Sequence, residues 1–489
     1  MLAGTLADGR VELAELHRFE NVPVRLPDGL HWNALTILRE ILTGLEAAAA
    51  RGRPVALGID TWGVDYGLLD GEGRLLGVPF HYRDRRTEGM IAVADELIPR
   101  AELYGVTGIQ RMPINTIFQL LAERGSPALE AAERIALMPD LLALWLTGRV
   151  TNEITVASTT GLLDARTGEW ARDVIERLRL PARIFGELIE PGTEIGPLLP
   201  DHRRAAGLDS QLSVFAVAGH DTASAFAGAP LPGTERAAIL SSGTWSLLGL
   251  ELDQPVLGGA ALEFNLTNER GIDGTTRLLR NVMGLWLLQE CRRAWAEGPG
   301  DAPSYAELAR MAEEADPDVP LFDPDLDELL APDDMPAAIR AACERAGQRA
   351  PEGQGELVRS ILTSLACKYR LVLERLEAVT GARVEVICVV GGGVRNELLC
   401  RLTAELCDLP VLAGPAEATA LGNVLVQARG RGELGSLAEL REVAAASARP
   451  RRYEPGSEAD RRRAAETYAR FLQATGLESP AKSATTSNA

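Results

Sequence analysis

Asp221 is the residue of this chain whose surroundings best suit chemistry. It ends the apolar run 214-VFAVAGHDT-222, which has the length of a buried strand, and a histidine and a threonine flank it. Because open α/β sheets gather their binding crevices at the carboxyl ends of strands, an acid there can accept a proton from a substrate hydroxyl. Asp-Thr before Ala-Ser-Ala-Phe also suits the first turn of a helix, and the two roles are compatible.

Two further apolar runs end in turns of small residues, 237-AAILSSGTWSLLG-249 and 385-EVICVVGGGVRNELL-399. Gly, Ser and Thr let backbone N–H groups come close to a ligand, and such amides stabilise phosphate oxygens without a bulky side chain. Together with Asp221, the repeated strand-to-turn units predict a nucleotide-using α/β enzyme with an acid at the chemistry.

Two segments have the residue types that bind a sugar. In 57-LGIDTWGVDYGLLD-70, Trp62 and Gly63 lie between two aspartates, and a flat ring beside carboxylates and bare amides suits a sugar. A plain turn with its tryptophan in the core has the same pattern. The segment 281-NVMGLWLLQECRRAW-295 predicts a helix with Asn281 and Gln289 on one face. These amides could bond a sugar hydroxyl and a nucleotide, or simply be a helix cap and an exposed side chain.

Composition excludes several classes of protein. The net charge of −19 argues against broad contact with nucleic acid or an anionic membrane. The chain has only two lysines, Lys368 and Lys482, and neither follows a Gly-rich loop, so it is neither a P-loop enzyme nor a protein kinase. Without C-x-x-C pairs, a signal-peptide pattern or an apolar stretch of about 18 residues, we expect a cytoplasmic protein with reduced, buried cysteines.

The elements that position these residues follow from periodicity and turn chemistry. Hairpins are predicted over 1–20 and 64–80, and a strand over 54–60. Helices are predicted over 34–51, 86–98, 115–124, 127–134, 139–146, 356–379 and 396–407, with strands over 384–390 and 409–413. The acidic stretch 315–336 is interpreted as a solvated loop rather than a metal site, and no metal-ligating residue is assigned. A domain boundary is placed in 229-APLPGTE-235.

Taken together, these segments resemble the FGGY family of carbohydrate kinases, and within that family its rhamnulokinase subgroup. The family-wide part is 138-MPDLLALWLTGRVTNEITVASTTGLLDARTGEW-170 with the GHDT, SSGTW and GGGVRN turns. The subgroup part includes GIDTWGVDYGLLD, 82-YRDRRT-87, 108-GIQRMPINTIFQL-120, NVMGLWLLQ and 414-GPAEATALGN-423. The resemblance covers residues 1 to 455.

The resemblance implies an α/β fold of two ribonuclease-H-like (actin-like ATPase) lobes with a cleft between them. It implies a sugar-binding lobe over 1–229, a nucleotide-binding lobe over 236–430 and a C-terminal extension over 431–475. The polar composition of 476–489 predicts a disordered tail. It also implies transfer of the γ-phosphate of ATP, with Mg²⁺, to the C1 hydroxyl of L-rhamnulose. Matching positions make Asp221 the proton acceptor, place Gly63, His220, Asp221, Thr222 and Asn281 at the sugar, and place Thr244, Gln289 and Gly392 at ATP.

The chain departs from the family at its start. Family members begin with a strand carrying D-x-G-x-x-S-x-R, whose turn holds the ATP phosphates, and Met1 aligns just beyond that motif. Because this strand is central in the lobe's sheet, its loss would cost more than the ~5–15 kcal/mol stability of a domain. We therefore expect the protein to begin upstream of Met1. The alternatives are a sibling kinase for another ketose or polyol, such as xylulose or fuculose, and a sugar-binding pseudokinase that cannot hold ATP.

Overall fold

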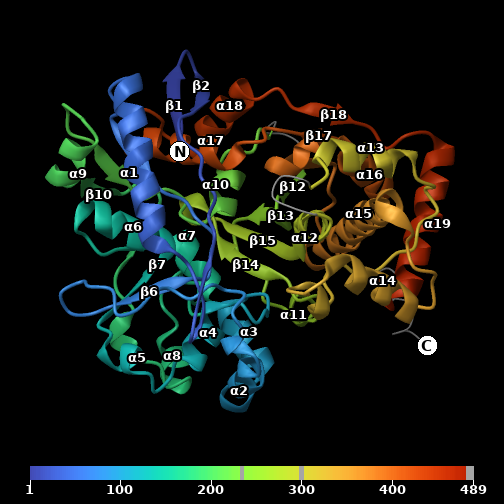
Figure 1. Cartoon of the computed structure of the whole chain (residues 1–489), viewed down its shortest axis with the longest axis horizontal. Helices are drawn as coiled ribbons and strands as arrows, with labels where there is room; N and C mark the ends of the chain where they lie inside the picture. The colour runs from blue at the N-terminus through green and yellow to red at the C-terminus, as the bar shows by residue number, and fades with distance from the viewer. Residues whose placement is uncertain (232–235, 297–301, 481–489) are drawn as a thin grey trace. The chain divides into compact units, whose positions relative to one another are not determined.

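The computed structural model of the chain describes residues 1–231, 236–296 and 302–480 (Figure 1). The chain forms two compact units. Unit 1 comprises Met1–Ala229, Glu251–Leu278 and Ala418–Ser447, and unit 2 comprises Pro230–Leu250, Leu279–Glu417 and Ala448–Ala489. The lobes predicted from the sequence are contiguous, whereas these units are discontinuous, because the segments 251–278 and 418–447 belong with the first 229 residues. Residues 232–235 of the expected boundary lie outside the described residues.

The sheet that carries the site in unit 1 has three strands in the order β10-β11-β5. β11 (Ser213–Phe215) runs parallel to β5 (Ala56–Gly58) and antiparallel to β10 (Glu194–Pro197). β1 (Leu2–Ala7) and β2 (Arg10–Glu15) form a separate hairpin, which confirms the prediction over 1–20. Asp8 and Gly9 both have positive φ, the geometry that a two-residue hairpin turn requires.

The hairpin predicted over 64–80 forms only in its first part. The Leu76 amide donates to the Leu68 carbonyl at 2.8 Å and Leu69 bridges Leu75, but the main partner of β6 (Tyr66–Leu69) is β7 (Arg134–Leu137), to which it is antiparallel. Residue 134 was predicted as the end of a helix, because a short apolar strand cannot be distinguished from a buried helix by its pattern alone. Four shorter strands form two pairs, β3 (Val24–Leu26) with β4 (Gly29–His31) and β8 (Asn152–Glu153) with β9 (Leu188–Ile189).

Helices surround these strands in unit 1. α1 (Ala34–Arg51) matches its prediction, and its cap residue Asn33 accepts a hydrogen bond from the Thr36 amide at 3.2 Å. α10 (Asp221–Ala227) packs against α17 (Ala418–Gly430), a helix from near the C-terminal end of the chain (Figure 1). The other helices are α2 (Met90–Leu97), α3 (Arg100–Thr107), α4 (Thr116–Ala122), α5 (Pro127–Ala131), α6 (Met138–Thr147), α7 (Ile154–Ala157), α8 (Arg172–Arg177), α9 (Pro200–Ala205), α11 (Gly259–Glu263) and α18 (Leu437–Ser447).

Unit 2 is built on a mixed sheet in the order β13-β12-β16-β17-β18. β12 (Ala237–Ser242) pairs antiparallel with β13 (Trp245–Leu252) and parallel with β16 (Val386–Val390). β17 (Val411–Ala413) is parallel to β16, and β18 (Arg451–Tyr453) closes the edge antiparallel to β17. The run 237–249 is therefore two strands around the Gly243–Thr244 turn. β14 (Thr267–Arg270) belongs to unit 1, while β13 and β15 (Thr276–Met283) each begin in one unit and end in the other.

The helices of unit 2 include α15 (Gly353–Thr380), whose middle is fully buried. The helix predicted over 281–295 is wrong in its first turn, because residues 276–283 pair in a sheet and the helix begins only at Trp286. The other helices of unit 2 are α12 (Trp286–Ala294), α13 (Tyr305–Glu314), α14 (Met335–Arg345), α16 (Glu397–Cys407) and α19 (Glu458–Thr475). Within the described ranges, no helix combines the length and apolar character that crossing a bilayer requires.

The chain's six cysteines are all free, and five are buried. Of the tail expected over 476–489, Ser479 is buried and its hydroxyl donates to Glu374 at 2.8 Å. Residues 481–489 lie outside the described part of the chain.

Candidate active site

Asp221 is the first residue of α10, and residues 216–220 connect it to β11, which is shorter than the predicted strand and ends at Phe215. Its amide donates to the Thr61 carbonyl at 2.8 Å, and the Thr61 amide donates to the Gly219 carbonyl at 2.9 Å. The two chain segments that leave β5 and β11 are thereby held side by side. The Thr222 hydroxyl donates to Asp221 Oδ1 at 3.1 Å, while 46% of the Asp221 side chain stays exposed. The carboxylate is anchored through its backbone and open to a ligand.

The neighbouring turn at Gly63 is strained and firmly held. Val64 has φ +69°, a rare conformation for a β-branched residue, and the Asp65 amide donates to the Gly63 carbonyl at 2.9 Å. Thr159 Oγ1 accepts the Val64 amide at 3.0 Å, and Thr116 Oγ1 donates to the Val64 carbonyl at 2.6 Å. Strain of this kind persists only where the surroundings over-determine it, and it gathers at binding sites.

Trp62 belongs to an aromatic cluster around a buried carboxylate. Asp65 Oδ2 accepts from the indole N–H groups of Trp32 at 2.5 Å and Trp62 at 2.9 Å, and the two indole rings are 4.0 Å apart. Burial raises the pKa of Asp65 to about 6, although these donors and Gln119 lower it. Trp62 packs against the core, as the reading of a plain turn predicts, and it remains partly exposed.

Glu153 holds the turn before Asp221 by a hydrogen bond to its backbone. Its carboxylate is 2% exposed and accepts from the Gly219 amide at 2.9 Å, the Thr155 hydroxyl at 2.6 Å and the Thr155 amide at 2.8 Å. Burial raises the pKa of Glu153 to about 7 in spite of these donors. Asp140 lies next to it, and burial followed by the charge of Glu153 raises the pKa of Asp140 as well.

A second carboxylate, Asp60, lies in the same turn region. Asn423 Nδ2 donates to Asp60 Oδ2 at 2.5 Å, across 363 residues of sequence. Burial raises the pKa of Asp60 to about 6, and the negative charge of Asp221 adds to that rise. Among the described residues no group of three or more His, Cys, Asp and Glu side chains could hold a metal. Two carboxylates still suit Mg²⁺ that is bound mainly by phosphates, since such an ion needs only one or two from the protein.

His220 is the buried neighbour of Asp221. Its Nε2 lies 3.5 Å from Asp221 Oδ1, and its Nδ1 lies 3.3 Å from Glu269 Oε2. Arg277 contacts both Glu269 and His220. The structure thus brings four of the predicted sugar residues, Gly63, His220, Asp221 and Thr222, into unit 1.

The residues predicted to contact ATP lie in unit 2, and two of them touch. Thr244 Oγ1 donates to Gln289 Oε1 at 3.3 Å, and the Gly284 and Trp286 amides donate to the Thr244 carbonyl at 3.2 and 3.0 Å. The turn between β12 and β13 therefore rests on the start of α12. Gly284 is required there, because a Cβ atom on it would lie 2.7 Å from the Trp245 carbonyl carbon.

Gly392 lies in the turn after β16, as the sequence predicts. Gly393 packs on Ser242, where a Cβ atom would come within 2.0 Å of the hydroxyl, whereas a Cβ on Gly392 would meet no atom within 4 Å. The Gly392 backbone is exposed, so this short stretch is open to a ligand while its neighbour is fixed against β12.

Asn281 does not share a helix face with Gln289, because it lies in β15 and not in α12. A buried charge cluster holds the strand on both sides of it. Arg280 Nη2 lies 3.1 Å from Asp325 Oδ2, and the Met283 amide donates to Asp325 Oδ1 at 2.9 Å. Lys368 Nζ contacts Asp325 at 3.1 Å, so this part of the 315–336 stretch is a buried ion-pair network and not a solvated loop.

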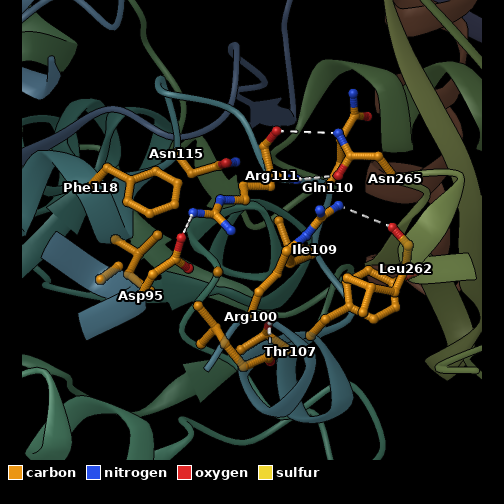
Figure 2. Close-up of a pocket in the computed structure, with 15 residues that line it drawn as sticks. Asp95, Arg100, Thr107, Ile109, Gln110, Arg111, Asn115, Phe118, Leu262 and Asn265 are labelled. Carbon is orange, nitrogen blue, oxygen red and sulfur yellow. Dashed lines mark hydrogen bonds and ion pairs between the residues drawn. The ribbon is translucent and has the colours of Figure 1, made fainter. Parts of the chain in front are cut away.

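A separate pocket of about 460 Å³, including its open mouth, lies in unit 1 between α2, α3 and α11 (Figure 2). The motif 108–120 supplies Gln110, Arg111, Asn115 and Phe118 to its lining, and none of the predicted site residues lines it. Its cations are already engaged, since Arg111 pairs with Asp95 and Arg100 donates to the Leu262 carbonyl at 3.2 Å (Figure 2). The pocket is therefore distinct from the site around Asp221.

Glu153, Glu269 and Arg277 are three residues of this region that were not predicted from the sequence. Glu153 and Arg277 are charged residues in runs of apolar residues and Thr, 152-NEITVAS-158 and 276-TRLLR-280, whereas Glu269 lies in the polar stretch 267-TNER-270. An ionisable residue in an apolar run is costly to bury without a partner, which was the available signal for the first two. The partner itself could not be named from sequence, because it comes from another element.

Comparison with known proteins decides the family. A model of the N-terminal domain of the FGGY family of carbohydrate kinases matches residues 30–228, and a model of the C-terminal domain matches residues 238–431. The chain is a member of this family. It is a carbohydrate kinase with ATP as its phosphoryl donor and a small-molecule sugar substrate.

Relatives in the family align with nearly the whole chain. A rhamnulokinase of Bacteroides thetaiotaomicron is 42% identical over 457 residues, covering 93% of each protein. A rhamnulokinase of Bacillus subtilis is 37% identical over 448 residues, covering 91% of this chain and 90% of the relative.

Solved structures of similar proteins show the fold. A gluconate kinase of Lactobacillus acidophilus superposes with a TM-score of 0.77 at 14% identity, covering 95% of this chain and 93% of the other. A glycerol kinase of Plasmodium falciparum with ADP superposes with a TM-score of 0.72 at 15% identity, covering 96% and 94%. This family member has the α/β fold of two ribonuclease-H-like, actin-like ATPase lobes, as expected from the sequence.

Proposed function

We propose that this carbohydrate kinase phosphorylates L-rhamnulose at its C1 hydroxyl, giving L-rhamnulose 1-phosphate and ADP. The supporting observation is the half-exposed Asp221 carboxylate, held at the start of α10 by the segments that follow β5 and β11. The choice of sugar rests on the rhamnulokinases that are 42% and 37% identical over most of the chain.

Asp221 acts as the proton acceptor in this proposal. The C1 oxygen attacks the γ-phosphorus of ATP. The bond between the γ-phosphorus and the β,γ-bridging oxygen breaks, and ADP leaves with that oxygen. The hydroxyl proton passes to an Asp221 oxygen. Since phosphoryl transfer needs positioning and charge stabilisation more than covalent help, one well-placed carboxylate is sufficient as the base.

The remaining residues bind and orient the substrates. In unit 1, Gly63, His220 and Thr222 contact the sugar, with the Trp62 ring as a flat apolar surface beside it. Asn281 contributes an amide to the sugar, and its strand is fixed by the Asp325 network. Thr244, Gln289 and Gly392 contact ATP. Residues 1–229 belong to the sugar-binding lobe and 236–430 to the nucleotide-binding lobe.

Mg²⁺ would be held by the ATP phosphates with Asp60 or Asp221. When bound, it supplies neutralisation of the phosphate charge. We also propose that the enzyme works in the cytoplasm, where ATP is available and the six free cysteines stay reduced.

Kinetics with a panel of ketoses tests this function. We expect kcat/KM for L-rhamnulose to exceed that for xylulose and fuculose. A preference for xylulose would transfer the proposal to another sugar of the family. Sugar binding without ATP binding, measured by calorimetry, would contradict kinase activity and favour a sugar-binding pseudokinase.

A further inference from the structure

Three charged or polar side chains form a closed cluster next to Asp221. His220 is 7% exposed, Glu269 is 4% exposed and Arg277 is fully buried. They come from three places in unit 1, the turn before α10, β14 and β15. Because a buried charge is costly unless it is paired, the geometry of this cluster constrains what each member can do.

Arg277 Nη2 lies 3.2 Å from Glu269 Oε2 and 3.2 Å from His220 Nδ1. A guanidinium group has N–H donors and no acceptor, so its contact with His220 requires a lone pair on Nδ1. The proton of the neutral imidazole is then on Nε2, which lies 3.5 Å from Asp221 Oδ1. The Asp221 carboxylate favours the same tautomer, because an N–H dipole facing an anion is attractive.

Glu269 competes for the opposite tautomer. Its Oε2 lies 3.3 Å from His220 Nδ1 and would accept a proton on that nitrogen. The same oxygen contacts Arg277, and the guanidinium supplies the positive charge that Glu269 needs. The tautomer of His220 therefore depends on which of its two neighbours, Arg277 or Glu269, determines the protonation of Nδ1.

We propose that Arg277 is a positioning residue of the phosphoryl-transfer site, oriented by Glu269, which fixes His220 as the Nε2–H tautomer. This places one N–H donor and one carboxylate acceptor, Asp221, side by side. A hydroxyl group needs such a pair, since its oxygen accepts from Nε2–H while its hydrogen is donated to the carboxylate. As the proton leaves, the N–H stabilises the charge that develops on oxygen. The catalytic meaning of this arrangement rests on the proposed role of Asp221, whereas the tautomer itself does not.

The tautomer can be measured directly by ¹⁵N NMR of the imidazole nitrogens in the full-length protein. The chain has five histidines, and the spectrum of His220→Gln identifies the signals of His220. We expect His220 to carry its proton on Nε2 in the wild type. In Arg277→Met, Glu269 is the partner left at Nδ1, so the proton should move to Nδ1. A wild-type His220 protonated on Nδ1 would overturn the proposal, and that spectrum needs no variant to fold.

Two further variants separate the cause from general damage. Glu269→Gln should keep the Nε2–H tautomer, because Arg277 still donates to Nδ1; a switch in this variant would make Glu269 the determinant and refute the proposal. Arg441→Met removes another partly buried arginine of unit 1, paired with Glu251, and should leave the His220 signals unchanged. If Arg441→Met changed them as Arg277→Met does, the effect would be non-specific and the proposal would be lost.

Kinetics then connects the tautomer to catalysis. We expect Arg277→Met to lower kcat/KM for the sugar by about 10²-fold, as for a displaced orienting group, with ATP affinity retained. Arg277→Lys, which keeps a cationic donor, should recover part of the loss together with the Nε2–H signal. An Arg277→Met enzyme with a switched tautomer and wild-type kinetics would show that the tautomer does not matter to transfer. If the wild type phosphorylates no sugar, the proposed function fails while the NMR result still stands.

Discussion

Gly422 and Ser224 lie so close that a Cβ atom on Gly422 would be 1.8 Å from the Ser224 carbonyl oxygen. Gly422 is in α17 and Ser224 is in α10, the helix that begins with Asp221. Only glycine permits this approach of two helix backbones. The position of the proposed base thus depends on a residue about 200 positions away in the sequence, as the numbering shows.

Gly422→Ala should displace α10, because the atoms that the new methyl group meets are backbone and cannot rotate away. We expect a loss of about 1–3 kcal/mol in stability and a fall of about 10²-fold in kcat, measured by urea unfolding and by a coupled ADP assay. Gly105→Ala is the matched control, since it adds a methyl group to a helical glycine with no atom within 4 Å. Equal effects of the two substitutions would contradict the close packing of α10 on α17.

Glu153 predicts a pH dependence of stability. Burial raises the pKa of Glu153 to about 7, above that of an unfolded glutamate. Between these two pKa values Glu153 is protonated in the folded state and ionised in the unfolded state. The free energy of unfolding is therefore highest at low pH and falls as the pH rises towards about 7. A shift of this size corresponds to about 3 kcal/mol.

Unfolding of the wild type and of Glu153→Gln by urea at pH 5, 6, 7 and 8 measures this contribution. We expect the variant to lose less stability than the wild type between pH 5 and 8. Some slope remains, because burial also raises the pKa of Asp60 and of Asp65 to about 6. Parallel pH profiles for the two proteins would show that Glu153 is already ionised in the folded state at pH 5.

Lys368 should be essential to the stability of unit 2. Its side chain is 1% exposed, and its Nζ contacts Asp323 at 2.7 Å and Asp325 at 3.1 Å. Burial by itself raises the pKa of Asp325, but the charges of Lys368 and Arg280 outweigh it and hold that pKa below its usual value. Lys368→Met leaves these carboxylates undercompensated, so we expect a loss of about 3–5 kcal/mol.

Arg310→Met is the control for Lys368→Met, because it removes an exposed ion pair with Glu314 on α13. Exposed pairs of this kind contribute about 0–1 kcal/mol. Chemical unfolding should therefore show a large shift for Lys368→Met and almost none for Arg310→Met. Similar shifts would mean that the Lys368 network contributes no more than a surface pair.

Local sequence signals predicted those parts of the structure that local interactions determine. The Asp8–Gly9 turn predicted the first hairpin, and a long 3.6-residue period predicted α1 and α15. Asn281 was misplaced because strand pairing overrode a pattern that is locally helical. Likewise, the strand over 134–137 was missed, with residue 134 placed at the end of a helix, because a four-residue apolar strand has no distinctive period.

In the candidate site, too, residues in local turns were predictable and their partners from distant segments were not. The GHDT, SSGTW and GGGVRN turns lie where strands end, so Asp221, Thr244 and Gly392 could be singled out from sequence. The buried side chains that contact the residues of these turns could not be predicted in this way. Arg277 reaches His220 across 57 residues and Asn423 reaches Asp60 across 363, and a single sequence holds no signal for pairing at such separations.

The central claim is that the Asp221 carboxylate accepts the proton of the sugar hydroxyl. Transfer of phosphate from ATP to L-rhamnulose, followed by ³¹P NMR with wild type and Asp221→Asn side by side, tests it most directly. We predict that the wild type forms the sugar 1-phosphate and that Asp221→Asn is about 10²–10⁴-fold slower, while its affinity for ATP is nearly unchanged. An Asp221→Asn protein that turns over at a rate close to that of the wild type would contradict the account.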